Sequence, residues 1–136
     1  MNFFLAFIDL EKAYDSVPHS NLWKFMADIG INGTILHILK EYYTENVAYA
    51  KIGNELSDPI EVTKGLRQGR SLSTILFNIY LEKTLDYWKK SCQELGVPIE
   101  ENKCLFSFNY VDDQVIRAQD SDDLEFILKR LKKAYK

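Results

Sequence analysis

The spacing of apolar and polar positions predicts the order of strands and helices along the chain. A short, continuously apolar run at 3–8 is typical of a buried strand. Apolar residues at helical spacing then predict two amphipathic helices, one beginning at the capping residues 19–21 and ending at Gly30, the next beginning at Asn32 or Thr34. The faces expected in the core are Leu22, Phe25, Met26 and Ile29 in the first helix, and Ile31, Ile35, Ile38, Leu39 and Tyr42 in the second.

The second half of the chain predicts hairpins and two further helices. A turn at Gly53-Asn54 favours a β-hairpin. Further along the chain, residues 72–90 are apolar on most of a helical circumference, which predicts a long buried helix. The expected elements are a hairpin of residues 47–52 and 59–63, a helix over 72–90 ended by Gly96 and Pro98, a hairpin of 104–110 and 114–118 around a turn at 111–113, and a last amphipathic helix capped by Asp120 to Asp123. The order indicates an α+β fold without repeats or linkers.

Composition narrows the class of protein. The 136 residues suffice for one domain or a part of one, and 46% hydrophobic with 27% charged residues predict a packed rather than a disordered chain. A net charge of −3 argues against a domain that neutralises a phosphate backbone with a basic face. Cys92 and Cys104 do not have the spacing of a zinc site, and two cysteines are too few for a disulfide framework. We therefore expect an intracellular protein, nuclear or cytoplasmic, with no secretion signal and no membrane partner.

Acidic residues follow two of the predicted strands. Asp9 comes directly after the strand at 3–8, and Asp112-Asp113 follow the apolar stretch 106–111. If these strands are neighbours in a sheet, the three carboxylates converge at one edge, where they repel one another unless a cation lies between them. Taken singly, each acid is better interpreted as a turn residue. Taken together, the acids predict a metal site.

Three ordered motifs resemble the reverse transcriptases of non-LTR (LINE-like, jockey-type) retrotransposons. Residues 7–19 (FIDLEKAYDSVPH) resemble motif A, residues 65–80 with their GLRQG start resemble motif B, and residues 110–113 (YVDD) resemble motif C. The GLRQG form points to non-LTR elements rather than LTR elements or group II introns. The resemblance covers almost the whole chain and implies a palm-like antiparallel sheet with helices packed on one face, in an incomplete form.

The resemblance also implies a metal site. Asp9 and Asp112 match the two main metal ligands, and Asp113 matches the third, less direct acid. Leu10 would offer its backbone carbonyl to a metal ion. The implied cofactor is two Mg²⁺ ions, with Mn²⁺ as a possible substitute.

Nucleotide-binding roles are implied for a second group of residues. Tyr14 matches an aromatic gate that favours dNTPs over rNTPs, although a core tyrosine is the alternative. Gln68 and Gly69 match positions beside the incoming nucleotide, where glycine lets the backbone approach a ligand closely. A P-loop is excluded because three residues, not four, separate Gly65 from Gly69. Departures from the family stand at Arg70-Ser71 and Thr74, where Cys-Pro and Pro are usual.

The function that these motifs imply is RNA-directed DNA polymerisation, in which two metal ions assist nucleotidyl transfer to a primer 3′-hydroxyl. The partners would be an RNA template, a DNA primer and dNTPs. Because the chain begins at motif A and stops soon after motif C, we expect residues 1–136 to be a partial domain without fingers, later palm motifs or thumb, and inactive alone. One alternative is a non-catalytic remnant that serves as a small binding module. Another is a metal-dependent phosphohydrolase, for which only His19 and His37 could be the base, although His19 and Asp15 are expected as helix-cap and turn residues.

Overall fold

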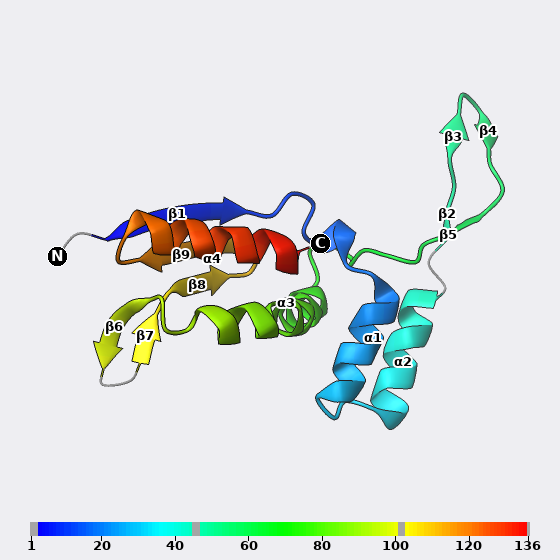
Figure 1. Ribbon diagram of the computed structural model, residues 1–136. Coiled ribbons are helices and arrows are strands. Elements are labelled where there is room, and N and C mark those ends of the chain that lie inside the picture. Colours follow the sequence, from blue (N-terminus) through cyan, green and yellow to red (C-terminus); the bar gives the residue numbers. More distant parts are fainter. Residues whose placement is uncertain (1–2, 45–46, 101–102, 136) are drawn as a thin grey trace. The chain divides into compact units, whose positions relative to one another are not determined.

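The structure, a computed structural model, describes residues 3–44, 47–100 and 103–135. Helices and antiparallel strand pairs form an α+β fold (Figure 1), which confirms the predicted class. The helices are α1 (His19–Asp28), α2 (Gly33–Thr44), α3 (Ser71–Cys92), α4 (Ser121–Ala134) and the short 3-10 helix η1 (Tyr14–Ser16). The strands are β1 (Phe4–Asp9), β2 (Val47–Ala48), β3 (Lys51–Ile52), β4 (Glu55–Leu56), β5 (Ile60–Glu61), β6 (Val97–Glu100), β7 (Lys103–Leu105), β8 (Ser107–Tyr110) and β9 (Asp113–Ala118).

The chain divides into two compact units. We call Met1–Ala13 with Leu81–Lys136 the sheet unit, and Tyr14–Tyr80 the hairpin unit. Helix α3 continues from the hairpin unit into the sheet unit. None of the helices in the described ranges is long and apolar enough to cross a membrane.

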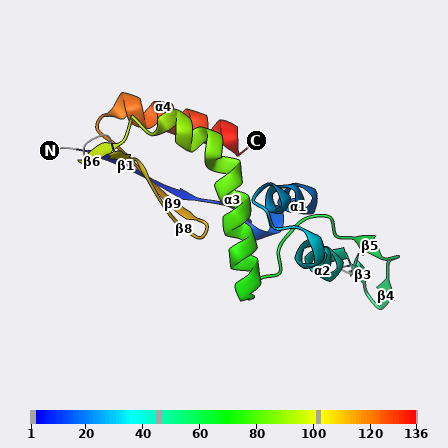
Figure 2. The same cartoon turned by 90° about the horizontal axis from the view of Figure 1, so that it is seen from below.

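A three-stranded antiparallel sheet organises the sheet unit. Its order is β1-β9-β8, and its register pairs Phe4 with Ala118 and Asp9 with Asp113. Along β9, Gln114, Ile116 and Ala118 are buried. Helix α4 contacts β9 and β1 and covers this buried face (Figure 2). The strand expected at 3–8 and the hairpin expected over 104–118 are therefore neighbours in one sheet, as predicted. The expected burial of this strand is wrong, because β1 lies at the edge of the sheet and Phe7 on the face opposite α4 is 78% exposed.

Trp88 anchors the helical layer of the sheet unit. Its indole Nε1 donates a hydrogen bond to the Ile127 carbonyl of α4 at 3.1 Å, and its ring makes an edge contact with Phe106 at 5.2 Å between centroids. On the same side, Tyr135 donates to Gln114 Oε1 at 3.2 Å, and burial raises the pKa of this phenol to about 12. The end of α3 and the whole of α4 therefore form one layer on one face of the sheet.

Helix α4 begins as the sequence predicts. The Asp120 carboxylate accepts a hydrogen bond from the Asp123 backbone N–H at 2.8 Å, which satisfies one of the free donors of the first turn. Acidic residues in the first turn and lysines in the last turn also suit the helix dipole. The predicted capping of this helix is confirmed.

Helix α2 buries a different face from the predicted one. Leu36 and Tyr43 are in the core, whereas Ile35, Ile38 and Tyr42 are exposed. The cause is the aromatic contact with α1, because the Tyr43 ring packs against His19 and Trp23 and so sets the rotation of the helix. Helical spacing fits both faces, and packing selects one of them.

The hairpins also differ from the predicted bounds. The first forms two short ladders, β2 with β5 and β3 with β4, around the expected turn at Gly53-Asn54. The stretch predicted as one strand over 104–110 breaks at Phe106, which is buried against Trp88 and whose carbonyl accepts a hydrogen bond from the Arg117 N–H at 2.8 Å. Strand β7 instead pairs with β6 in a hairpin that was not predicted. Asp113, expected in the turn, is the first residue of β9.

The long helix predicted over 72–90 is confirmed as α3, which ends at Cys92, before the expected stop at Gly96 and Pro98. Its burial is less complete than predicted, because Leu72 and Ile75 are exposed.

Candidate functional site

Two of the predicted acids lie opposite each other in the sheet unit. Strand β1 ends at Asp9 and β9 begins at Asp113, and the two residues are partners in the antiparallel register. Partners in a ladder project from the same face of a sheet. This face is the one opposite α4, since the neighbouring Gln114 points to the helical layer and hydrogen-bonds with Tyr135. Both acids are exposed and have no ion-pair partner among the described residues.

The third acid belongs to the turn beside this pair. Because Tyr110 and Asp113 are partners, Val111 and Asp112 form a two-residue hairpin turn. Val111 has a φ of 58°, in the left-handed region that such turns favour but that a β-branched side chain rarely adopts. The structure thus keeps a strained residue next to half-buried Asp112.

Replacing Val111 by Gly should relieve this strain. Left-handed backbone costs an L-residue about 1–2 kcal/mol, and glycine removes this cost. Glycine also loses more backbone entropy on folding than valine does, which offsets part of the gain. We therefore expect the free energy of unfolding to rise by about 0.5–1 kcal/mol. Denaturant titration followed by circular dichroism measures it. The matched control is Val115→Gly, which removes a half-buried valine from the middle of β9 and should destabilise the chain. A loss of stability in Val111→Gly as large as in the control would show that side-chain packing outweighs strain at this turn.

The acid pair fits a divalent cation of the magnesium type. Like charges placed directly opposite each other destabilise a sheet, and a bound cation removes this repulsion. Mg²⁺ commonly takes only one or two protein carboxylates, with substrate phosphates and water as the other ligands. Within the described ranges, no group of three or more acidic, histidine or cysteine side chains is placed to hold an ion. The donor set that the sheet brings together is therefore Asp9 with Asp113, next to Leu10 and Asp112 in sequence.

In the hairpin unit, backbone hydrogen bonds join the segments of motifs A and B. The Gly65 N–H donates to the Val17 carbonyl and the Leu66 N–H to the Tyr14 carbonyl, both at 2.8 Å. Gly65 has a φ of 99°, and a Cβ at this position would lie 3.3 Å from the Asp15 backbone oxygen. The close approach of the chain to itself therefore requires a glycine at the start of this loop.

Tyr14 and Gln68 are held by side chains for which the sequence pattern gave no catalytic role. The Tyr14 ring stacks on Phe77 with 4.8 Å between centroids, and its hydroxyl donates to Thr74 Oγ1 at 3.4 Å. Gln68 Nε2 donates to Asp15 Oδ1 at 3.2 Å. Phe77 and Thr74 are three residues apart on α3, so helical spacing could have indicated a shared face.

Gly69 lies on the exposed side of this loop. It has a φ of 75°, and no atom lies within 4 Å of the position that a Cβ would take. The loop is therefore open at Gly69, whereas it is closely packed at Gly65.

The histidines differ from the predicted roles. Pro18, not His19, is the N-cap of α1, and it makes no side-chain cap. His19 is buried, and its Nε2 lies 2.7 Å from the Gly65 carbonyl oxygen, to which it donates. His37 is exposed and lies 3.4 Å from Glu41 on the same helix. Neither arrangement favours a histidine base of a phosphohydrolase.

Comparisons with known proteins agree with the motifs. The reverse transcriptase (RNA-dependent DNA polymerase) family matches residues 2–136. A transposon TX1 uncharacterized 149 kDa protein of Xenopus laevis is 32% identical over 123 residues, which are 89% of this chain and 9% of that protein. A retrovirus-related Pol polyprotein from the type-1 retrotransposable element R2 of Popillia japonica is 29% identical over 76 residues, which are 56% of this chain and 12% of the polyprotein.

The chain thus spans about a tenth of the length of these two relatives, with 9% of one and 12% of the other. The family match covers both the acid pair of the sheet unit and the motif B loop of the hairpin unit. The chain therefore belongs to the reverse transcriptase family and is a segment of the non-LTR retrotransposon kind that its three motifs predicted.

Proposed function

We propose that this segment supplies the carboxylates for nucleotidyl transfer in a non-LTR reverse transcriptase, which extends a DNA primer on an RNA template with dNTPs. The observation that carries the proposal is the placement of Asp9 directly opposite Asp113, with Asp112 in the adjoining turn. A sheet of this kind with helices on one face and acids on the other supports a palm-like arrangement. Family membership supports the choice of polymerisation over other metal-dependent reactions.

In this proposal Asp9, Asp112 and Asp113 hold two Mg²⁺ ions, for which Mn²⁺ can substitute, and Leu10 adds its carbonyl. When bound, the ions would favour ionisation of the primer 3′-hydroxyl and neutralise charge on the leaving pyrophosphate. The chain's own contribution is to fix the acids on a sheet. The ladder between β1 and β9 sets the distance between the two strands, and the two-residue turn limits where Asp112 can lie.

Residues of the hairpin unit would position the incoming nucleotide. Gln68 and Gly69 are exposed, and Gln68 is oriented by its hydrogen bond to Asp15. Tyr14 would act as the gate that excludes a ribose 2′-hydroxyl, because stacking on Phe77 fixes the plane of its ring. The alternative, a tyrosine that only packs α3 against η1, fits the same contacts.

Replacing Tyr14 by Ala separates these two roles. In a complete relative that carries this segment, we expect the ratio of rNTP to dNTP incorporation to rise about ten-fold or more, because the clash with the 2′-hydroxyl is lost. Tyr14→Phe is the matched control, since it keeps the ring and removes only the hydrogen bond to Thr74. An active Tyr14→Ala variant that rejects rNTPs as the parent does would assign Tyr14 to packing alone.

The test of the proposed function is to exchange this segment for the matching one in a complete non-LTR reverse transcriptase. Primer extension on an RNA template with dNTPs supports the proposal. A well-folded hybrid that binds Mn²⁺ at the acids but incorporates no dNTP would contradict it and favour the alternative of a non-catalytic binding remnant.

A further inference from the structure

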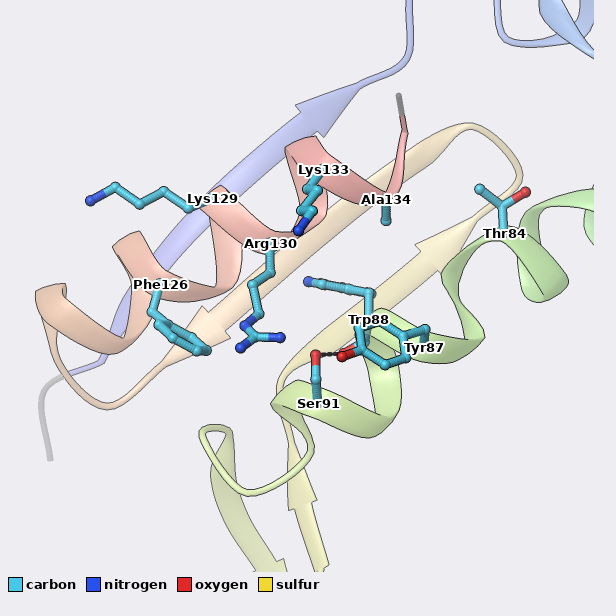
Figure 3. Close-up of a pocket in the computed structure, with 9 residues that line it drawn as sticks. All are labelled: Thr84, Tyr87, Trp88, Ser91, Phe126, Lys129, Arg130, Lys133 and Ala134. Atoms are coloured by element: carbon cyan, nitrogen blue, oxygen red, sulfur yellow. Dashed lines mark hydrogen bonds between the residues drawn. The ribbon is translucent and has the colours of Figure 1, made fainter.

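A groove lies on the helical side of the sheet unit, between α4 and the end of α3 (Figure 3). Its volume is about 650 Å³. The lining residues are Thr84, Tyr87, Trp88 and Ser91 from α3 and Phe126, Lys129, Arg130, Lys133 and Ala134 from α4. Three of them are cationic and none is acidic, although the whole chain has a net charge of −3.

Two of the cations face the groove. Figure 3 shows Arg130 extending from α4 toward α3 with Lys133 beside it, whereas Lys129 points away. Lys129 is also paired with Glu125 at 2.6 Å. Lys133 has no ion-pair partner within the part of the chain that the structure describes. An anion in the groove would therefore meet two cations without competition from a carboxylate of the lining.

Aromatic rings lie beside these charges. The Tyr87 side chain is 76% exposed, and Phe126, which is 43% exposed, lies under the Arg130 guanidinium at 4.8 Å from its centroid to the Arg Cζ. Buried Trp88 forms the floor, and the Ser91 hydroxyl donates to its backbone carbonyl at 2.9 Å. An exposed ring next to a pair of cations combines stacking with phosphate attraction, which are the two contributions on which single-stranded nucleic acid binding depends.

We propose that this groove binds a single-stranded segment of nucleic acid, with a phosphate at Arg130 and Lys133 and a base stacked on Tyr87. The site is separate from the acid pair, because Asp9 and Asp113 project from the opposite face of the sheet. An acidic peptide would meet the same charges. The preference for nucleic acid rests on the exposed planar ring and on the family to which the chain belongs.

Tryptophan fluorescence of the 136-residue chain can test the stacking contact. Trp23→Phe leaves Trp88 as the single indole, and EDTA in the buffer keeps the experiment independent of any metal site. Oligouridylate should change the Trp88 emission in a saturable way, and Tyr87→Ala should weaken binding about five-fold or more. Tyr49→Ala, which truncates an exposed tyrosine of the hairpin unit, should leave the Kd unchanged. Equal Kd values for Tyr87→Ala and its parent would overturn the proposal.

The salt dependence of the Kd tests the phosphate contact. Arg130→Gln with Lys133→Gln should lower the slope of log Kd against log salt by about 0.7, the contribution of the one phosphate of a single strand that these two cations neutralise. The matched control, Lys24→Gln with Lys40→Gln, changes the net charge equally at exposed positions of α1 and α2. The same loss of slope in both pairs would show only diffuse attraction and overturn the proposal. Displacement of oligouridylate by polyglutamate at equal charge concentration would overturn it in favour of an acidic peptide.

Discussion

Asp112→Asn or Asp9→Asn, in a complete reverse transcriptase carrying this segment, is expected to lower the rate of dNTP incorporation about 100-fold or more. Loss of a group that merely orients a metal ligand commonly costs 10–100-fold, roughly, in metal affinity or activity, and these carboxylates are proposed as the ligands themselves. Each change keeps the size of the side chain and removes one negative charge. Steady-state primer extension on an RNA template measures the effect.

The matched control for these substitutions is Asp28→Asn. Asp28 is an exposed acid at the end of α1, so its replacement changes the net charge equally and should leave incorporation unchanged. Full activity of the hybrid with Asn at position 9 or 112 would remove the acids from the mechanism.

Asp113→Asn tests which observation better predicts the effect of an acid on nucleotide incorporation: its partner in the sheet or its position in motif C. The resemblance makes Asp113 the less direct acid, whereas the ladder places it opposite Asp9. If the pairing of Asp113 with Asp9 makes both acids metal ligands, Asp113→Asn should impair incorporation as severely as Asp9→Asn. A loss much smaller than that of Asp112→Asn would show that the residue in the turn is the closer ligand.

Local signals predicted the elements that depend on local physics. Continuous apolar residues located the strand that became β1, although they wrongly predicted that it is buried. The acid at position 120 located the start of α4, because an N-cap is decided within a few residues. The β6–β7 hairpin was missed because Pro98 indicates the end of an element, although a proline is tolerated in a strand of this short, two-stranded kind. The face of α2 was missed because Leu36 and Tyr43 repeat at helical spacing just as the exposed residues do.

The candidate site shows a similar division between local and distant causes. The acids that follow two predicted strands indicated that Asp9 would lie beside the hairpin of residues 104–118, and the pairing of Asp9 with Asp113 confirms this. By contrast, the close approach of Asp15 to Gly65 joins residues far apart in the sequence, and no local pattern contains it. The basic residues of the groove were not singled out either, because Arg130 and Lys133 have the spacing of an ordinary solvated helix face.

Saturating Mg²⁺ or Mn²⁺ is expected to stabilise the isolated chain. An ion that binds only the folded state at a hundred times its Kd adds about 2.7 kcal/mol to the free energy of unfolding. The physical reason is the repulsion between Asp9 and Asp113, which exists only when the β1–β9 ladder is formed and which a cation removes. Urea titrations with the chloride salt of each metal and with EDTA, at constant ionic strength, measure the difference.

Asp9→Asn with Asp113→Asn should abolish this response and, in EDTA, should make the chain slightly more stable than its parent, by about 0.2–1 kcal/mol, because the opposed charges are gone. Asp28→Asn with Asp58→Asn removes the same charge from exposed positions and should keep the full response. An equal metal effect in both double variants would locate the cations elsewhere. If metal ions stabilise the isolated chain but the hybrid polymerase is inactive, the metal site is preserved while the positioning of primer and nucleotide is lost. This combination of results separates a binding remnant from a working polymerase segment.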